Sequence, residues 1–144
     1  MNIIKDLYYG EKPLNKLDFY IPDNKDFTTI VYFHGGGLKE GDKSDHNYVD
    51  FGKTFTDNGY AFVSVNYRMY PKNKFPDFLY DAANSIKYVF DHIKEYNGSG
   101  EVIVSGQSAG AWMSLMIALD NKYLNSVGID PFDIPKSRAI CFLG

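Results

Sequence analysis

"EVIVSGQSAGAW", residues 101–112, joins an apolar run to a glycine-rich turn and then to a stretch with helical spacing. Its apolar part, 102–105, lacks the polar alternation of a half-exposed strand, which is typical of a strand buried on both faces of a sheet. The runs 28–33 and 61–65 have the same character. Buried strands separated by helix-length segments predict an α/β fold with a mostly parallel sheet.

The segments between the buried strands carry apolar residues at helical spacing. These patterns predict helices over about residues 48–58, 76–97 and 108–119, the first two followed by the stop signals Gly59 and Gly98. Shorter strand patterns complete the chain, at residues 3–8, 17–21 and 139–143. We therefore expect a three-layer α/β/α sandwich built on a mostly parallel sheet of about six strands.

Length and composition predict one globular domain over residues 1–144. A formal charge of -3 gives no reason to expect nucleic acid or an anionic membrane as a partner. Short charged clusters such as Asp42–Lys43 are expected on a solvated surface. Cys141, the single cysteine, is expected to be a buried, inert thiol. No early apolar stretch suits a signal peptide or membrane span, which predicts a cytoplasmic protein.

Two glycine motifs each follow a predicted buried strand directly. Residues 34–37 read His-Gly-Gly-Gly, and residues 106–110 read Gly-Gln-Ser-Ala-Gly. Ser108 on a sharp strand-to-helix turn would present its hydroxyl above the sheet, while Gly106 and Gly110 leave room for that turn. Because the carboxyl ends of parallel strands meet at one edge of a sheet, the two motifs are expected to lie together.

Ser108 is the candidate nucleophile of this pair of motifs. The helix after it points N–H groups at the turn and favours negative charge there, so the N–H of Ala109 is a candidate oxyanion donor. The N–H groups of Gly36 and Gly37 are the other candidates, because bare backbone approaches a substrate oxygen closely. A bland turn explains one such motif alone, whereas both in this order are strong evidence for a site.

The chain resembles the amino-terminal part of the α/β-hydrolases, nearest to the hormone-sensitive-lipase-like and small carboxylesterase or acetyl-esterase branches. Besides the glycine motifs, "EGDKSD" at 40–45 and "VSVNYRMYPKNKFPDFLYDAANSIKYV" at 63–89 carry the resemblance. It runs from about residue 17 to about residue 119 and implies an α/β-hydrolase fold with serine-hydrolase chemistry.

The resemblance also implies roles for single residues. Ser108 matches the nucleophile, and the N–H groups of Gly36, Gly37 and Ala109 match the oxyanion hole. His34 matches a residue that orders the loop and is not the catalytic base. The other residues that support the motifs are Gly35, Gly106 and Gly110.

Three further positions match family residues that we interpret as structural. They are Tyr67, Arg68 and Asp81, and Arg68 is expected to pair with a carboxylate such as Asp42 or Asp81.

The general base is the missing part of the predicted site. The family's triad runs serine, acid, histidine along the chain, but every histidine precedes Ser108. His92 is expected at the opposite edge of the sheet, and His46 is interpreted as a surface or helix-start residue. Asp130 and Asp133 precede the last predicted strand and are poor acid candidates. We therefore expect a domain truncated at its carboxyl end, lacking the last strands, the triad acid and the histidine, and nearly inactive alone.

The predicted function is a carboxylesterase-type serine hydrolase that cleaves small acyl esters through an acyl-enzyme on Ser108. Two alternatives are an arylformamidase or small peptidase of the same fold and a non-catalytic, hydrolase-like binding protein. A separate chain that supplies the acid and the histidine is a further alternative. No cofactor or metal site is expected, because no two histidines have ligand spacing. The apolar strand at 139–143 would be a sheet edge, which predicts self-association.

Overall fold

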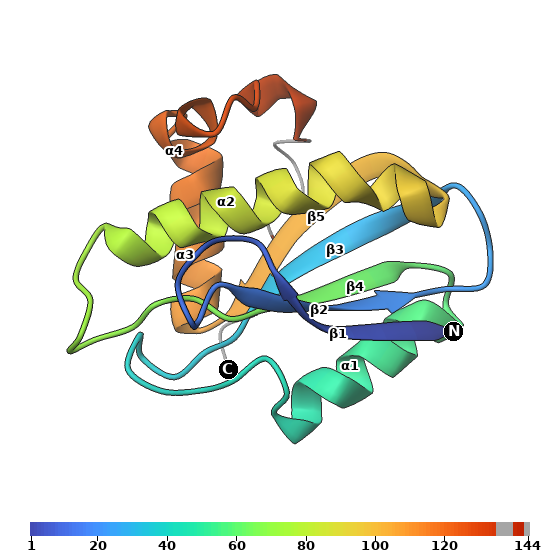
Figure 1. Ribbon diagram of the computed structural model, residues 1–144, viewed down its shortest axis with the longest axis horizontal. Helices are drawn as coiled ribbons and strands as arrows, with labels where there is room; N and C mark the ends of the chain where they lie inside the picture. Colours follow the sequence, from blue (N-terminus) through green and yellow to red (C-terminus); the bar gives the residue numbers. More distant parts are fainter. Residues whose placement is uncertain (135–139, 143–144) are drawn as a thin grey trace.

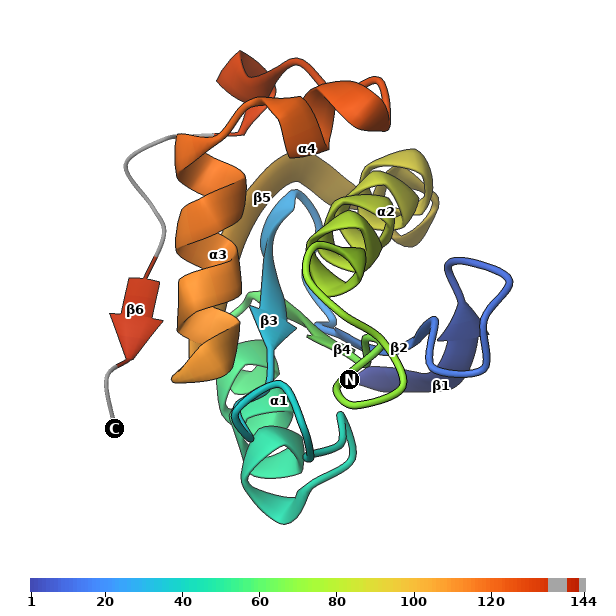
Figure 2. The same cartoon turned by 90° about the vertical axis from the view of Figure 1, so that its left-hand side faces the viewer.

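The computed structural model describes residues 1–134 and 140–142, which form a sheet with helices on both faces (Figures 1 and 2). In chain order the elements are β1 (Asn2–Tyr8), β2 (Lys16–Ile21), β3 (Phe27–Phe33), α1 (His46–Asp57), β4 (Ala61–Val65), α2 (Asp77–His92), the 3-10 helix η1 (Ile93–Tyr96), β5 (Gly98–Gln107), α3 (Ala109–Leu119), α4 (Lys122–Ser126), the 3-10 helix η2 (Pro131–Asp133) and β6 (Ile140–Phe142).

The sheet has six strands in the order β1-β2-β4-β3-β5-β6. The strands β4, β3, β5 and β6 run parallel, while β2 pairs antiparallel with both β1 and β4. This confirms the expected mostly parallel sheet. Phe33, at the end of β3, is in register with Val65 of β4 and with Gly106 of β5, so these strands end at a common edge.

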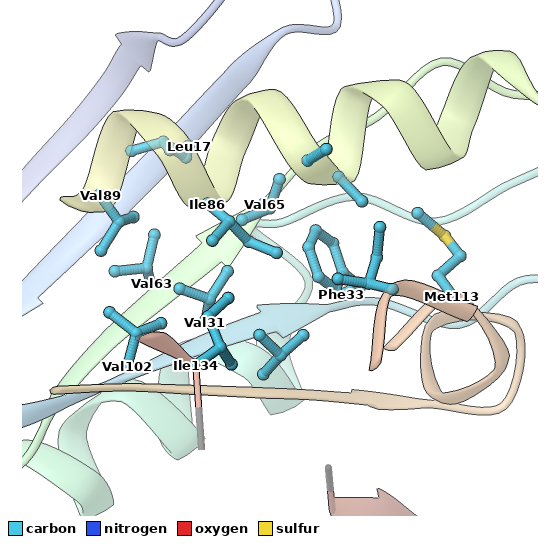
Figure 3. Packing of buried hydrophobic residues seen from close by; sticks show 14 of the residues in the cluster. Leu17, Val31, Phe33, Val63, Val65, Ile86, Val89, Val102, Met113 and Ile134 are labelled. Atoms are coloured by element: carbon cyan, nitrogen blue, oxygen red, sulfur yellow. The ribbon is translucent and has the colours of Figure 1, made fainter. Parts of the chain in front are cut away.

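The two faces of the sheet bury two separate apolar clusters. Val31 and Phe33 of β3 pack toward α2 and α3, whereas Ile30 and Tyr32 pack toward α1. Figure 3 shows the larger cluster, in which side chains of α2 such as Ile86 reach down to the sheet. Because successive residues of a strand point to opposite faces, a strand between two helix layers is buried on both sides and is mostly apolar. The three-layer α/β/α prediction is confirmed.

The three predicted helices begin close to where the pattern places them, and α1 and α3 also end there, whereas α2 ends earlier. α2 follows Pro76 as expected, but it ends at His92 and tightens into η1, which Asn97 closes with a φ of 70°. Asn adopts this left-handed conformation more readily than most residues, so it acts as the stop before Gly98. The short helices α4 and η2 were not predicted, because segments of five and three residues are too short to show a helical period.

The predicted strand at 139–143 corresponds to β6, which pairs with β5 at the edge of the sheet. Ala139, Leu143 and the side chain of Cys141 lie outside the described residues, so the burial of that thiol stays a prediction. Self-association through this edge and a cytoplasmic location also stay predictions. Across the described ranges, no helix has the length and apolar character needed to cross a membrane.

Candidate active site

Ser108 occupies a strained turn between β5 and α3. Its φ of 51° and ψ of -113° lie outside the regions that side-chain-bearing residues normally adopt. Such a conformation persists only where the surroundings enforce it, and it is concentrated at functional sites. The side chain is exposed at the carboxyl edge of the sheet. The predicted strand-to-helix turn is present, with Ser108 as the residue before the first turn of α3.

Two glycines make this turn possible by close backbone packing. A Cβ on Gly110 would lie 1.9 Å from the carbonyl oxygen of Phe33, and one on Gly106 would lie 2.4 Å from the Gly110 carbonyl. No side chain fits at either distance. The turn is therefore pressed against the end of β3, directly before the other glycine motif. Figure 2 shows the end of β3 and the start of α3 at the same edge of the sheet.

The loop after β3 brings its glycines to Ser108. A Cβ on Gly35 would lie 3.1 Å from the carbonyl oxygen of Gln107 and 3.4 Å from Cβ of Ser108, so the loop lies close against the turn. Gly36 has a φ of +119° and Gly37 a φ of +64°, conformations that glycine adopts without strain. The N–H groups of Lys39 and Glu40 donate to the carbonyl oxygen of Gly36, which closes a tight turn.

The three predicted oxyanion donors have open N–H groups. Ala109 is the first residue of α3, where an N–H has no acceptor within the helix. The N–H groups of Gly36 and Gly37 donate to no acceptor within residues 1–134 or 140–142. Gly36 lines the cavity that contains Ser108, whereas Gly37 is exposed. This geometry favours Gly36 and Ala109 as the pair nearest the nucleophile.

His34 is buried beneath this loop. Its ring stacks on Tyr67 with centroids 4.4 Å apart, and its Nδ1 lies 2.7 Å from the carbonyl oxygen of Gly35. The Tyr67 hydroxyl donates to the His34 carbonyl oxygen at 2.6 Å. Burial disfavours the charged ring and lowers the pKa of His34 below its ordinary value. These contacts suit a residue that orders the loop.

A cavity of about 620 Å³ opens beside Ser108. The residues lining it come from both glycine motifs and from the start of α1: Gly35, Gly36, Glu40, Gly41, Asp42, Asp45, Tyr48, Gln107 and Ser108. Of these, only Gly35, Gly36 and Ser108 were predicted as site residues; Tyr48 and Gln107 are among those that were not. The Tyr48 hydroxyl accepts from the Gly35 N–H and donates to Oε1 of Gln107, both at 3.3 Å. A buried tyrosine on an apolar helix face needs such a partner, which was the available signal.

Asp42, a carboxylate that lines the cavity, accepts hydrogen bonds from residues next to the loop. Partial burial disfavours the charged form of Asp42, but hydrogen bonds from Asn66 and Ser44 hold the pKa of its carboxyl below the ordinary value. Arg68 was expected to pair with Asp42 or Asp81. It pairs with Asp81, with Nη2 2.8 Å from Oδ1, which ties the chain after β4 to α2.

The remaining histidines lie away from Ser108. His46 begins α1 with a side chain that is 89% exposed and 3.4 Å from Asp50. His92 ends α2, where its ring stacks on Tyr88. Neither lines the cavity. The carboxylates of η2 are also distant, because it follows α3 and α4, and α3 alone spans roughly 16 Å.

Lys43 contradicts the expectation of a solvated charged cluster. Its side chain is 4% exposed, and its Nζ lies 2.7 Å from Oδ1 of Asp18, which is fully buried. Lysine and aspartate are buried to this extent when they pair with each other. The prediction was wrong because the partner belongs to β2, far from Lys43 in sequence.

Most of the chain matches a known protein family. The BD-FAE family model matches residues 17–135, which include both glycine motifs and Lys43. This chain belongs to the BD-FAE family. The resemblance to α/β-hydrolases of the esterase branches is thereby confirmed.

Individual relatives agree with this assignment. The probable carboxylic ester hydrolase LipM of Mycobacterium tuberculosis is 30% identical over 96% of this chain and 34% of its own length. Kynurenine formamidase of Debaryomyces hansenii is 27% identical over 82% of this chain and 40% of its own length. Esterase B of Lactobacillus rhamnosis has the same fold, with a TM-score of 0.74 at 19% identity over 90% of this chain and 43% of that one. The BD-FAE chain described here spans less than half the length of the curated relatives that it matches.

Proposed function

We propose that this chain carries the nucleophile and the oxyanion hole of a serine esterase that acts on small acyl esters. The observation that carries the proposal is the conformation of Ser108, an exposed serine at positive φ whose turn is packed against the loop of Gly35 and Gly36. Strain of about 1–3 kcal/mol at one exposed serine has a clear use if it aims a hydroxyl at a substrate.

In the proposed reaction, Oγ of Ser108 attacks the carbonyl carbon of the ester. The carbonyl oxygen becomes an oxyanion and accepts hydrogen bonds from the N–H groups of Ala109 and Gly36, with Gly37 at the outer side. The alkoxide leaves, and water then releases the acid from the acyl-enzyme. One oxyanion donor lowers the barrier by about 3–4 kcal/mol, because the dipoles are fixed before charge develops.

The proton of the Ser108 hydroxyl must pass to a base. None of the three histidines of this chain is placed to act as that base. His34 is buried against Tyr67, and neither His46 nor His92 lines the cavity. Without a base, the residual acceleration over water is about 10³–10⁴-fold, supplied by the oxyanion hole and binding.

Acetyl transfer from p-nitrophenyl acetate tests this proposal in the chain as it exists. The p-nitrophenolate ion leaves without a proton, so the reaction needs no general acid, and hydroxide or water from the solvent accepts the proton of the Ser108 hydroxyl. We expect peptide mass spectrometry to locate one slowly formed acetyl group on Ser108, and Ser108→Ala to abolish it. Ser126→Ala, which removes another exposed serine, is the matched control and leaves the rate unchanged. Acetylation of Ser108 no faster than of Ser126 refutes the proposal.

An arylformamidase is the second candidate, supported by the likeness to the kynurenine formamidase of Debaryomyces hansenii. The two activities share the nucleophile and oxyanion hole and differ in the leaving group. An aryl amine must be protonated as it leaves, so this activity depends more strongly on the base. Comparing the hydrolysis of an acetyl ester with that of a formyl anilide, with added imidazole as the base, separates the two activities.

A further inference from the structure

Lys43 makes an ion pair that is almost completely buried. Its Nζ lies 2.7 Å from Oδ1 of Asp18 and 2.9 Å from Oδ1 of Asp6, whose side chain is 61% exposed. Burial disfavours the ammonium form, but hydrogen bonds to the two carboxylates raise the pKa of Lys43 above its ordinary value. The cation is therefore retained inside the protein.

The backbone of Lys43 is held as firmly as its side chain. Its N–H donates to Oδ1 of Asn66 at 2.8 Å, and its carbonyl oxygen accepts from Oγ of Ser64, also at 2.8 Å. Ser64 of β4 lies beside Asp18 of β2 in the β2–β4 ladder, and Asn66 follows β4. The partners of Lys43 therefore come from two neighbouring strands and from the chain directly after one of them. Lys43 is thus fixed to the sheet at three points.

The amino-terminal strand is shaped to meet this lysine. The ladder between β1 and β2 is irregular between Ile4 and Leu7, and Asp6 has a φ of 58°. At this irregularity the N–H of Asp6 donates to Oδ1 of Asp18, while its carboxylate reaches Lys43. An aspartate tolerates the left-handed conformation better than most residues. The irregular backbone therefore aims a second carboxylate at the same cation.

The segment that carries the loop glycines, residues 36–41, makes close contacts with itself just before Lys43 in the chain. A Cβ on Gly41 would lie 2.6 Å from both the carbonyl oxygen of Gly35 and Nδ1 of His34. A Cβ on Gly36 would lie 2.0 Å from the carbonyl oxygen of Glu40. The segment 36–41 therefore folds back onto its own start, and Lys43 holds the end of this segment against the sheet.

The ion pair is poorly built for stability alone. Oδ2 of Asp18 is buried and has no hydrogen-bond partner among the residues that the structure describes. Buried ion pairs are often no more stabilising than apolar side chains of similar size, because both ions lose their water. Their better-attested use is to select one arrangement among several.

We infer that Lys43 is a positioning residue for the oxyanion loop, the segment 34–43 after β3 that carries the N–H groups of Gly36 and Gly37. Its ion pair with Asp18 fixes the far end of segment 36–43 and thereby the direction of the Gly36 and Gly37 N–H groups. The inference rests on the proposed function of this loop.

The test removes both buried charges together. Lys43→Met combined with Asp18→Leu leaves no unpaired buried ion, since the remaining carboxylate of Asp6 is 61% exposed, so the double variant should fold with a free energy of unfolding close to that of the parent. We expect faster amide hydrogen exchange over residues 36–43 and a fall in Ser108 acetylation of roughly 10–100-fold, because misplaced donors no longer meet the oxyanion. Lys43→Arg with Asp18 intact keeps the charge of the ion pair, and this variant should retain much of the parental acetylation rate.

The matched control is Asp6→Asn, which alters the exposed partner of the same lysine. It should change the acetylation rate by about twofold or less, because exposed ion pairs contribute little. Parental exchange and parental acetylation in the double variant overturn the inference, and so does faster exchange with unchanged acetylation. Failure of the parent to acetylate at Ser108 refutes the proposed function instead, while exchange over 36–43 still reports whether Lys43 orders the loop.

Discussion

The turn at Ser108 and the loop after β3 meet at one edge of the sheet, but they are held in different ways. In the turn, backbone packs on backbone, as Gly110 against Phe33 shows. In the loop, side chains from distant parts of the chain hold the backbone, with Tyr67 beneath its start and Asp18 bonded near its end. The turn depends on the absence of side chains at its glycines, whereas the loop needs, besides its glycines, side chains from elsewhere in the chain.

This difference explains which parts of the site are visible in the sequence. A turn built from five consecutive residues leaves a local signature, Gly-x-Ser-x-Gly. A loop anchored through contacts distant in sequence leaves a signature only for its glycines. The following predictions test the two modes of support, beginning with the largest effect.

Gly110→Ala should be the most damaging change in the turn. The new Cβ would lie 1.9 Å from a backbone oxygen of β3, and neither backbone can move without opening the sheet. We expect the free energy of unfolding to fall by about 3 kcal/mol or more, measured by urea denaturation. Gly128→Ala is the control, since its φ is +76° but its surroundings are open; it should lose about 1 kcal/mol. Equal losses in the two variants would contradict close packing as the cause.

Ser108→Gly should stabilise the protein while it removes the nucleophile. Relief of about 1–3 kcal/mol of backbone strain outweighs the added freedom of a glycine in the unfolded chain, for a net gain of about 1 kcal/mol. The control is Asn97→Gly, because Asn97 also has a positive φ but in the ordinary left-handed region. That variant should change stability by about 0.5 kcal/mol or less. A loss of stability in Ser108→Gly would show that the turn is unstrained.

The smallest effect should be a pH dependence that arises from His34. Burial lowers its pKa in the folded state, so below the ordinary value of 6.5 the unfolded chain binds a proton that the folded chain does not. Stability should therefore decline as pH falls through that value and recover above it. His34→Asn, whose amide can replace the Nδ1 donor, should flatten this dependence in urea denaturation, and the exposed His46→Asn should not. Equal flattening in both would remove His34 as the source.

Most of the fold could be predicted because strands and helices leave regular patterns of apolar residues in the sequence. Buried strands such as β3 lack the polar alternation of a half-exposed strand, and α2 repeats its apolar face over sixteen residues. The buried charge of Lys43 could not be predicted, since its environment is set by Asp18 of β2, and the residue type alone indicates a surface. Tyr48 belongs to the helical pattern that predicted α1, but its hydroxyl contact with Gln107 depends on how α1 docks.

The pH dependence of Ser108 acetylation tests the central claim most directly, namely that this chain supplies a nucleophile and oxyanion hole without a general base. With no imidazole to accept the proton, the rate from p-nitrophenyl acetate should rise in proportion to hydroxide from about pH 5 to about pH 9. A rate that levels off with an apparent pKa of about 6–7 would reveal a histidine base within the chain and contradict the claim.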